Sequence, residues 1–317
     1  MYDRCVPTLD VLGHATWYTV QGAGAETVLL LHGGLSNSDA MLDSIGGPLG
    51  ERRRVAAFDR RGHGRTADTP EAFHYESMVD ETIAFIEHIG GPVHIVGWSD
   101  GGIVGLLLAL RRPELVGRLV AIGTNYHWNV LPDLPGAAAA DEGGVDETPE
   151  AESGDSGIVA LMAAAYADRS PDGPDHFAVV AAKGFHLFGI EPELTAEDLA
   201  RVSVPVLVMA GDDDLIPAEP HRCVLRRITR GPARDRAWSF TRTADRAPTG
   251  GRRSHRAIPG VRRPASDDDA QPARLSPGAA QRRPHRAPSA GGDARDREQG
   301  SYDRSPLTRQ ICRYACG

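Results

Sequence analysis

A serine at residue 99 lies between glycines in the segment Gly97-Trp98-Ser99-Asp100-Gly101. This G-x-S-x-G spacing is typical of a nucleophilic serine held on a sharp turn between a strand and a helix. An apolar run at 93–96 precedes the motif and another at 103–110 follows it, as that turn requires. The backbone N–H of Asp100, at the start of the expected helix, can donate to a developing oxyanion. We therefore predict nucleophilic catalysis at Ser99.

The elements that must position Ser99 alternate between short apolar runs and longer helical patterns. Helical periodicity covers 75–89 and 103–110. Such alternation predicts an α/β fold with a doubly wound, mostly parallel sheet and helices on both faces. Ligands of such sheets bind at the carboxyl ends of the strands, where the serine motif lies. The runs that predict strands are 13–20, 27–31, 55–59, 93–96, 119–123 and 204–210.

The stretch at about 131–200 interrupts this alternation. Its first part, 141–155, holds seven acidic residues and no basic one, which is typical of a solvated flexible loop. Two helical patterns follow at 157–167 and 174–188. We predict that this insertion forms a helical cap over the site.

Four motifs in this order resemble those of the α/β-hydrolase fold superfamily, over roughly residues 13–220. His32-Gly33-Gly34 is similar to the family segment that supplies the second oxyanion donor, which implies this role for Gly34, with Leu35 as the adjacent alternative. The stretch 59–64 is similar to a family turn whose role is mainly architectural. The resemblance implies a serine hydrolase of small esters or amides, acting through an acyl-enzyme on Ser99 with an oxyanion hole.

The fourth motif concerns the carboxylate that orients the catalytic base. The segment 211–217 is similar to the acid-bearing loop of the family, and its phase implies that Asp214 is the triad acid. Asp212 and Asp213 are the register alternatives.

The elbow itself has a narrower likeness. Trp98-Ser99-Asp100-Gly101-Gly102-Ile103 is similar to the elbow of biphenyl-hydrolase-like amino-acid-ester hydrolases. This likeness implies that Asp100 receives a substrate ammonium group and that Trp98 also contacts substrate. The alternative is that Asp100 only favours the helix N-terminus electrostatically, an effect worth about 0.3–1 kcal/mol.

The general base is absent from its expected place. A serine hydroxyl is a weak nucleophile without a base, and in this fold the chain order is serine, acid, histidine. The window 236–245 holds no histidine, and His221 lies only seven residues after the acid. His255 is the one plausible base in chain order, with His285 further along. The alternative to an active hydrolase is therefore an impaired hydrolase-fold protein that acts by binding.

Charge divides the chain of 317 residues at about the same point. The net charge is -8, but the first 220 residues hold 13 basic and 34 acidic residues, and the last 97 hold 22 and 9. One lysine against 34 arginines suggests GC-rich codons. We interpret 1–220 as the hydrolase domain and 221–317 as a disordered, Arg/Pro-rich low-complexity tail. Our hypothesis is that a change of reading frame near 218–225 replaced the native end, leaving the strand at 204–210 as an exposed edge.

Composition narrows the remaining classes. Spanning a bilayer takes roughly 18–20 unbroken apolar residues, and no stretch of the sequence reaches that length. The N-terminal residues lack a secretory pattern, so we expect a cytoplasmic protein without a membrane partner. The acidic first part disfavours nucleic-acid binding, and the acids within the tail disfavour it there. We expect a small-molecule substrate, no metal site and no cofactor; the sequence leaves the oligomeric state open.

Overall fold

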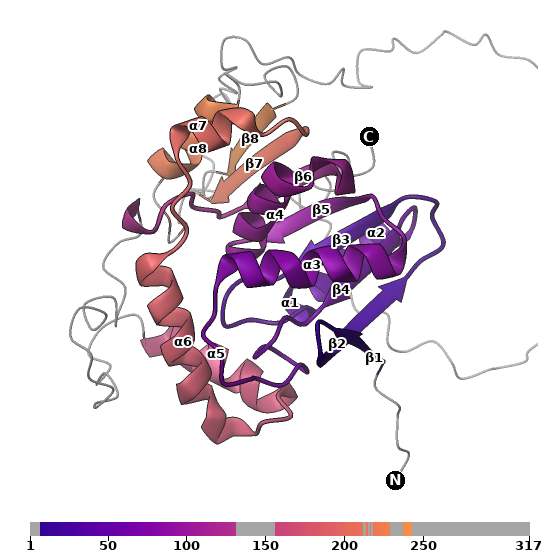
Figure 1. The fold of residues 1–317 in the computed structure, drawn as a ribbon, viewed down its shortest axis with the longest axis vertical. Coiled ribbons are helices and arrows are strands. Elements are labelled where there is room, and N and C mark those ends of the chain that lie inside the picture. Colours follow the sequence, from indigo (N-terminus) through magenta and orange to yellow (C-terminus); the bar gives the residue numbers. More distant parts are fainter. Residues whose placement is uncertain are drawn as a thin grey trace, which may run out of the picture. The chain divides into compact units, whose positions relative to one another are not determined.

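The computed structural model describes residues 7–130, 156–211, 214, 216, 218–228 and 237–242 (Figure 1). The strands are β1 (Thr8–Val11), β2 (His14–Gln21), β3 (Thr27–Leu31), β4 (Arg54–Phe58), β5 (Val93–Trp98), β6 (Val116–Ile122), β7 (Val206–Gly211) and β8 (Ala237–Arg242). The longer helices are α3 (Tyr75–Ile89), α4 (Asp100–Arg111), α5 (Ser156–Arg169), α6 (Phe177–Ile190), α7 (Ala196–Arg201) and α8 (Ala218–Ile228). Shorter helical segments are α1 (Asp39–Met41), η1 (Leu42–Gly46), α2 (Gly47–Gly50), η2 (Pro113–Leu115), η3 (Trp128–Val130) and η5 (Pro174–His176).

The strands form a sheet in the order β1-β2-β4-β3-β5-β6-β7-β8. Pairing is parallel from β4 through β8, and only β1 and β2 run antiparallel to their neighbours. All five residues of β3 are buried, as expected for a central strand covered on both faces. The predicted α/β class with a mostly parallel sheet is confirmed.

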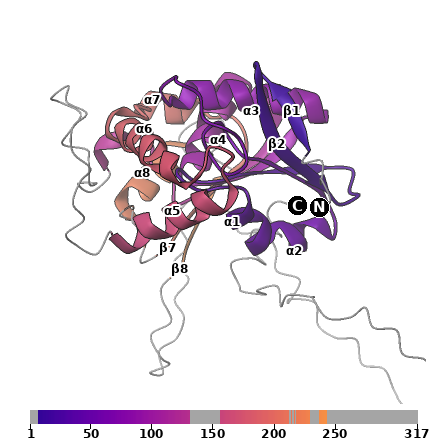
Figure 2. The ribbon, with the colours of Figure 1, turned by 90° about the horizontal axis from the view of Figure 1, so that it is seen from below.

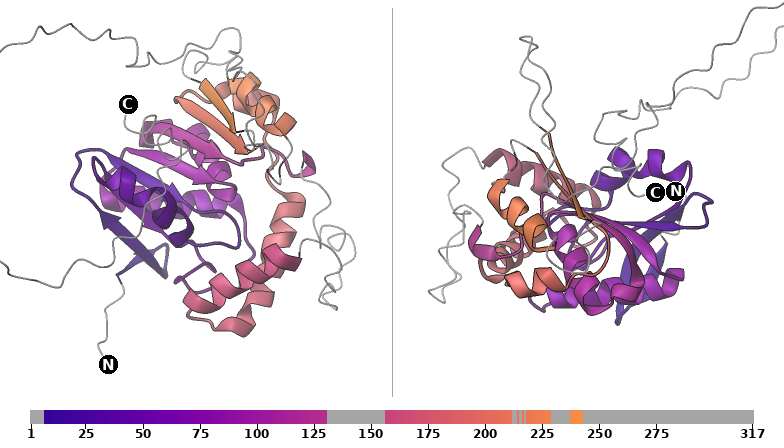
Figure 3. Two further views of the ribbon diagram at one scale, coloured as in Figure 1. Left: turned by 180° about the vertical axis from the view of Figure 1, so that it is seen from behind. Right: turned by 90° about the horizontal axis from the view of Figure 1, so that it is seen from above.

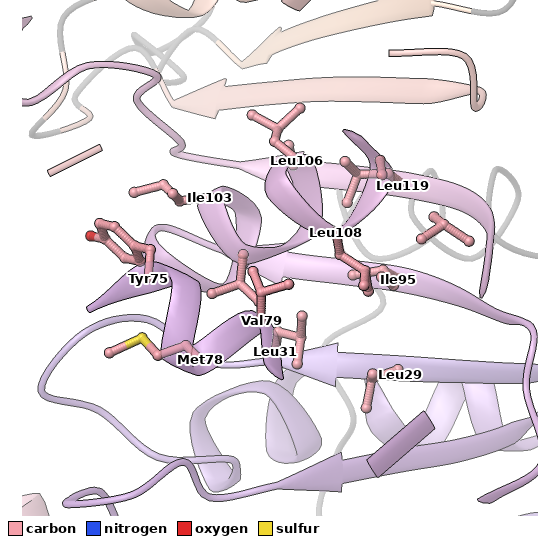
Figure 4. Packing of buried hydrophobic residues seen from close by; sticks show 14 of the residues in the cluster. Leu29, Leu31, Tyr75, Met78, Val79, Ile95, Ile103, Leu106, Leu108 and Leu119 are labelled. Carbon is pink, nitrogen blue, oxygen red and sulfur yellow. The ribbon is translucent and has the colours of Figure 1, made fainter. Parts of the chain in front are cut away.

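Helices cover the sheet on both faces (Figure 2). The figure shows α3 and α4 on one side of the strands and α1 and α2 on the other. On the first side, Leu29, Ile95 and Leu119 of the strands pack with Val79 of α3 and other buried side chains (Figure 4). Fully burying one such side chain is worth about 1.5–3 kcal/mol, so this layer fixes the positions of the strand ends. A second apolar cluster lies under α1 and α2.

The two predicted helical patterns of the insertion correspond to α5 and α6, which lie next to each other (Figure 3). Two polar contacts attach this pair to the loop after β4. Lys183 and His176 contact the buried carboxylate of Asp68, at 2.8 and 2.9 Å. Arg169 contacts Asp39, at 3.0 Å, and so ties α5 to the start of α1. The predicted acidic loop at 141–155 lies outside the described residues.

Secondary structure continues beyond residue 220, where the sequence was interpreted as a tail. Helix α8 crosses that point, and Val224, Leu225 and Ile228 join the core cluster of α3 and α4. Strand β8 pairs in parallel with β7 along six residues. The expectation of an exposed edge at β7 is therefore wrong. The expectation failed because arginines dominate the composition after residue 220, so the short apolar face of α8 does not stand out in the sequence. The tail from residue 243 onward lies outside the described residues.

No helix in the described part of the chain is long and apolar enough to cross a membrane.

Candidate active site

Ser99 lies on a strained turn between β5 and α4. Its backbone has φ 51° and ψ -117°, a sparsely populated conformation with positive φ that costs a non-glycine residue about 1–3 kcal/mol. Its N–H donates to the Ile122 carbonyl at 2.8 Å, and its carbonyl accepts from Gly102 N at 2.8 Å. These bonds join the turn to β6 on one side and to α4 on the other. The predicted strand–serine–helix geometry is present.

The glycines of the motif are required by close backbone approach. A Cβ at position 97 would lie 2.2 Å from the Gly101 carbonyl oxygen, and one at 101 would lie 2.0 Å from the Leu31 carbonyl oxygen. Both distances are far below any normal contact, and both obstacles are main-chain atoms. The glycines therefore let the serine turn sit directly on the end of β3.

Residues 32–35, which we call the oxyanion loop after the role predicted for them, lie against this turn. A Cβ at Gly33 would be 3.4 Å from the Ser99 Cβ, so the loop and the serine are in contact distance. Leu35 has a positive φ of 51° and is buried. A Cβ at Gly34 would lie 2.5 Å from Asp100 Oδ2 and 2.5 Å from Phe188 Cζ of the cap. The two segments predicted to supply oxyanion donors are thus neighbours, and the cap closes over them.

His32 is held in one tautomer by its surroundings. Its Nε2 accepts from the Arg60 backbone N–H at 3.2 Å, so the proton is on Nδ1, which donates to the Gly33 carbonyl at 2.7 Å. Burial, and then the charge of Arg60, hold the pKa of His32 well below its ordinary value. This histidine is therefore a neutral structural donor of the oxyanion loop.

Asp100 follows the serine and is 4% exposed. Its carboxylate accepts a 3.0 Å hydrogen bond from the Tyr75 hydroxyl. Burial raises the pKa of Asp100, and the opposing influences are the Arg60 charge, this hydrogen bond and its own backbone N–H. The carboxylate is thus enclosed by groups of the protein itself.

Trp98, the other predicted substrate contact, lies on the opposite side of the serine in the chain. Its side chain is 38% exposed, and its ring atom Cε3 would be 3.1 Å from a Cβ at Gly33. The indole therefore covers the first glycine of the oxyanion loop. Its contact with substrate stays a prediction.

Asp214 lies at the same edge of the sheet. Its carboxylate accepts from the backbone N–H groups of Gly211, at 3.3 Å, and Ile216, at 3.1 Å. A Cβ at Gly123 would be 3.2 Å from Asp214 Oδ2. Gly123 directly follows Ile122, whose carbonyl accepts the hydrogen bond from the Ser99 N–H. Asp214 and Ser99 therefore lie on either side of the end of β6. The alternatives Asp212 and Asp213 lie outside the described residues.

The predicted base lies outside the part of the chain that the structure describes. His255 and His285 lie outside the described residues, and His221 is buried on α8. His63 is buried beside the oxyanion loop, and burial, reinforced by the Arg60 charge, lowers its pKa to about 3. A histidine that stays neutral in this way is structural.

Two residues near the site were not predicted from the sequence. Tyr75 is the first residue of α3, and Arg60 follows the end of β4 within the turn interpreted as architectural. Both are buried and contact the elbow or the oxyanion loop. The only sequence signal for these two residues was their type and place: a large Tyr at the start of a predicted helix, and an Arg just after a predicted strand.

A strained serine between a parallel strand and a helix, faced by a glycine-rich loop from the neighbouring strand, defines an α/β-hydrolase. The chain belongs to the alpha/beta hydrolase family, whose model matches residues 28–234.

Curated relatives match a part of the chain. The uncharacterized hydrolase YraK of Bacillus subtilis is 34% identical over 112 residues, which is 34% of this chain and 41% of that protein. The mouse sn-1-specific diacylglycerol lipase ABHD11 is 37% identical over 98 residues, which is 30% of this chain and 31% of that protein. The match therefore spans less than half the length of these relatives.

Solved structures share the fold across more of the chain. A serine hydrolase involved in carbazole degradation, the CarC enzyme, has a TM-score of 0.57 at 24% identity, covering 75% of this chain and 89% of that one. An enol-lactonase from Burkholderia xenovorans has a TM-score of 0.53 at 18% identity, covering 74% of this chain and 90% of that one. At such identity the likeness concerns the fold.

Proposed function

We propose that the protein is a serine hydrolase of small esters or amides that forms an acyl-enzyme on Ser99. The strained conformation of Ser99, held against the oxyanion loop, is the observation that carries this proposal. Strain of this kind persists only where the surrounding structure imposes it, and it is concentrated at functional sites. Family membership supports the same reaction class.

In the proposed reaction, the Ser99 hydroxyl attacks the substrate carbonyl and loses its proton to a histidine base. The base returns this proton to the leaving alcohol or amine as the ester or amide bond breaks, and water then hydrolyses the acyl-enzyme with the same base. The backbone N–H groups of Asp100 and Gly34 donate to the oxyanion that develops, with Leu35 as the alternative to Gly34. Asp214 holds the base and stabilises its cation. His255 is the base in this proposal, because it is the first histidine after β8 in chain order.

The second candidate is an impaired hydrolase-fold protein that binds small molecules. It is favoured by one observation: among the described residues, the only histidine after Asp214 is His221, buried on a helix that packs into the core. Without a base, an oxyanion hole and substrate binding leave only a small part of normal catalysis.

A fluorophosphonate probe separates the two candidates. We expect labelling of the wild type, none of Ser99→Ala, and at least about tenfold slower labelling of His255→Ala and Asp214→Asn, because each removes a part of the proton relay. His186→Ala, which changes an exposed histidine of the cap, is the matched control. Folded wild type that is not labelled would favour the binding protein, and an unchanged rate in His255→Ala would remove that residue as base.

The surroundings of Asp100 support the electrostatic alternative over ammonium binding. Its carboxylate is buried, accepts from Tyr75 and lies in the field of Arg60, so a substrate cation would meet a carboxylate that is already partnered. We therefore expect similar kcat/KM for an α-amino ester and its des-amino analogue. A preference of more than about tenfold for the amino ester, equal to about 1.4 kcal/mol, would restore the ammonium role.

The location and partners of the protein remain those predicted. We propose a cytoplasmic enzyme of small molecules that does not bind nucleic acid, because 34 acidic residues in the first 220 would repel phosphates.

The hypothesis of a changed reading frame belongs to the second candidate, the impaired protein, and is retained with a shifted position. The family match extends to residue 234, α8 packs into the core and β8 pairs with β7, so we now place the proposed change after residue 242 and not near 218–225. Translating the other two frames of the gene tests it. A Gly-x-x-His segment followed by a helix is expected in one of them, and its absence from both would end the hypothesis.

A further inference from the structure

Arg60 is fully buried behind the oxyanion loop. Its Nη1 donates to the His32 carbonyl at 2.8 Å, and its Nη2 donates to the Gly33 carbonyl at 3.2 Å. Its backbone N–H holds His32 Nε2, and His32 in turn donates to the Gly33 carbonyl. The side chain and the backbone N–H of Arg60 therefore hold two successive peptide groups of the loop.

This guanidinium is costly to bury, so its placement needs compensation. Burial lowers the pKa of Arg60, while the charge of Asp100, followed by that of Glu81, favours the cation. Asp100 is also the residue whose N–H is the other proposed oxyanion donor. The buried cation is therefore linked to both sides of the hole.

Peptide geometry converts these contacts into an orientation of the donor. The peptide bond between Gly33 and Gly34 is trans, so the Gly33 carbonyl and the Gly34 N–H point in opposite directions. Arg60 and His32 both donate to the Gly33 carbonyl, so this carbonyl points toward them. The Gly34 N–H must then point away from Arg60, and the loop on that side contacts the elbow at Ser99 and Asp100.

We propose that Arg60 is a positioning residue of the oxyanion hole, which aims the Gly34 N–H by holding the carbonyls of His32 and Gly33. The proposal rests on the function proposed for Ser99. An arginine suits this task because its planar fork offers several donors in fixed directions, whereas the single ammonium of lysine does not.

The first test compares Arg60→Lys with Arg61→Lys on p-nitrophenyl acetate. Arg61 is the matched control because it is also buried but donates to the Ala72 carbonyl, at 2.9 Å, and not to the oxyanion loop. We expect Arg60→Lys to lower kcat by about 10²-fold, the scale for losing one oxyanion donor, with KM within about threefold of wild type. Arg61→Lys should keep kcat within about threefold. Equal losses of kcat in both variants would overturn the proposal, because they would show a general effect of a buried charge.

The second test does not need turnover. In protein labelled with ¹³C and ¹⁵N, Arg60→Lys should shift the Gly33 carbonyl resonance and speed hydrogen exchange at the Gly34 amide, and Arg61→Lys should leave both unchanged. Wild type without Ser99-dependent turnover would end the proposed function, and the inference about Arg60 would then be decided by these resonances alone. Unchanged resonances in folded Arg60→Lys would overturn it.

A double variant covers the case in which Arg60→Lys does not fold. Arg60→Met with Asp100→Asn removes both buried charges together, which cores tolerate better than an unpaired charge. It is compared with Asp100→Asn alone by the same two measurements. The additional loss of kcat and the Gly33 shift should appear only in the double variant, and identical behaviour of the two proteins would contradict the proposal.

Discussion

The hydroxyl of Tyr75 donates a 3.0 Å hydrogen bond to Asp100, the residue that follows the serine. The backbone N–H of the same tyrosine donates to Glu191 Oε2, at 2.9 Å, just after the end of the cap helix α6. Tyr75 therefore connects the cap to the elbow through a single residue. Because the Tyr75 hydroxyl donates to it, the Asp100 carboxylate can be buried beside Ser99 without an ammonium group as partner.

Replacing Tyr75 by Phe should remove the hydrogen bond to Asp100 at little cost in volume. Hydrogen bonds to charged groups contribute about 1.5–3 kcal/mol, so we expect a loss of that order in the free energy of unfolding at pH 8. The bond lowers the pKa of Asp100, and its loss should therefore matter less at pH 4, where more of the carboxyl is protonated. Urea unfolding at both pH values measures this.

Tyr166→Phe is the matched control for that experiment. In the wild type, the Tyr166 hydroxyl donates to Asp172 over 3.5 Å, and this hydrogen bond is only partly buried. The expected loss in the free energy of unfolding is therefore under about 0.5 kcal/mol. An equal, pH-independent loss in the two variants would argue against a specific link between Tyr75 and Asp100.

Changing Gly97 to Ala should destabilise the protein by at least about 3 kcal/mol, because the new Cβ meets a main-chain oxygen that cannot move freely. Gly157→Ala, on α5, is the control: nothing lies within 4 Å of its Cβ, so we expect a gain of about 0.5–1 kcal/mol. Thermal unfolding of both variants decides the matter. A Gly97→Ala protein as stable as wild type would show that the turn is not as tight as described.

The strain at Ser99 has a separate test. Because φ is positive there, Ser99→Gly should be more stable than Ser99→Ala by about 1 kcal/mol, although glycine gains entropy in the unfolded chain. Both variants lack the proposed nucleophile, so stability is compared without a difference in the proposed function. Equal stability of the two would contradict the strained conformation.

His63 should make stability depend on pH in the acidic range. Its pKa is about 3 in the folded protein and about 6.5 when unfolded, so the unfolded state takes up the proton first. This contribution to stability is present above pH 6.5 and is lost as the pH falls toward 3, by up to about 1.4 kcal/mol for each pH unit. His63→Gln should reduce the slope of the free energy of unfolding against pH by the equivalent of about one bound proton.

The control for this slope is His186→Gln, since His186 is exposed on α6. We expect this variant to unfold as the wild type does. A His63→Gln protein with the wild-type slope would mean that this imidazole titrates normally in the folded state.

Lys183→Met should loosen the cap locally. The Lys183 ammonium lies 2.8 Å from Asp68, with the two side chains 16% and 4% exposed. Although burial opposes it, the hydrogen bonds from Lys183 and His176 hold the pKa of Asp68 below its usual value. Leaving this carboxylate with fewer partners should cost about 2–3 kcal/mol, seen as faster hydrogen exchange in α6.

Arg111→Met is the corresponding surface control. Its ion pair with Asp80 is exposed at both ends, at 44% and 46%, and such pairs contribute about 0–1 kcal/mol. Exchange in α6 should stay as in wild type. If Lys183→Met left that exchange unchanged too, the pair with Asp68 would not be what holds the cap.

Much of the fold was readable from the sequence because the informative residues are neighbours in the chain. The apolar run of β3 and the periodicity of α3 predicted both elements, and α3 has the predicted bounds of 75–89. The strand, glycines and helix around Ser99 predicted the elbow, because its geometry is set within about ten residues. The end of the sheet was missed, since the arginine-rich composition after residue 220 masked the short apolar face of α8 and the strand β8.

The sequence by itself determined the fold class, and it predicted the nucleophile and the residues of the oxyanion loop, since each depends on local spacing. Only the tertiary structure decided what surrounds Asp100 and the loop. Tyr75 and Arg60 reach them from the ends of α3 and β4, and Phe188 reaches them from the cap. These contacts join residues 25 or more positions apart, and packing of helices on the sheet creates them. A buried carboxylate and a buried guanidinium acquire their roles from such neighbours, which no local pattern specifies.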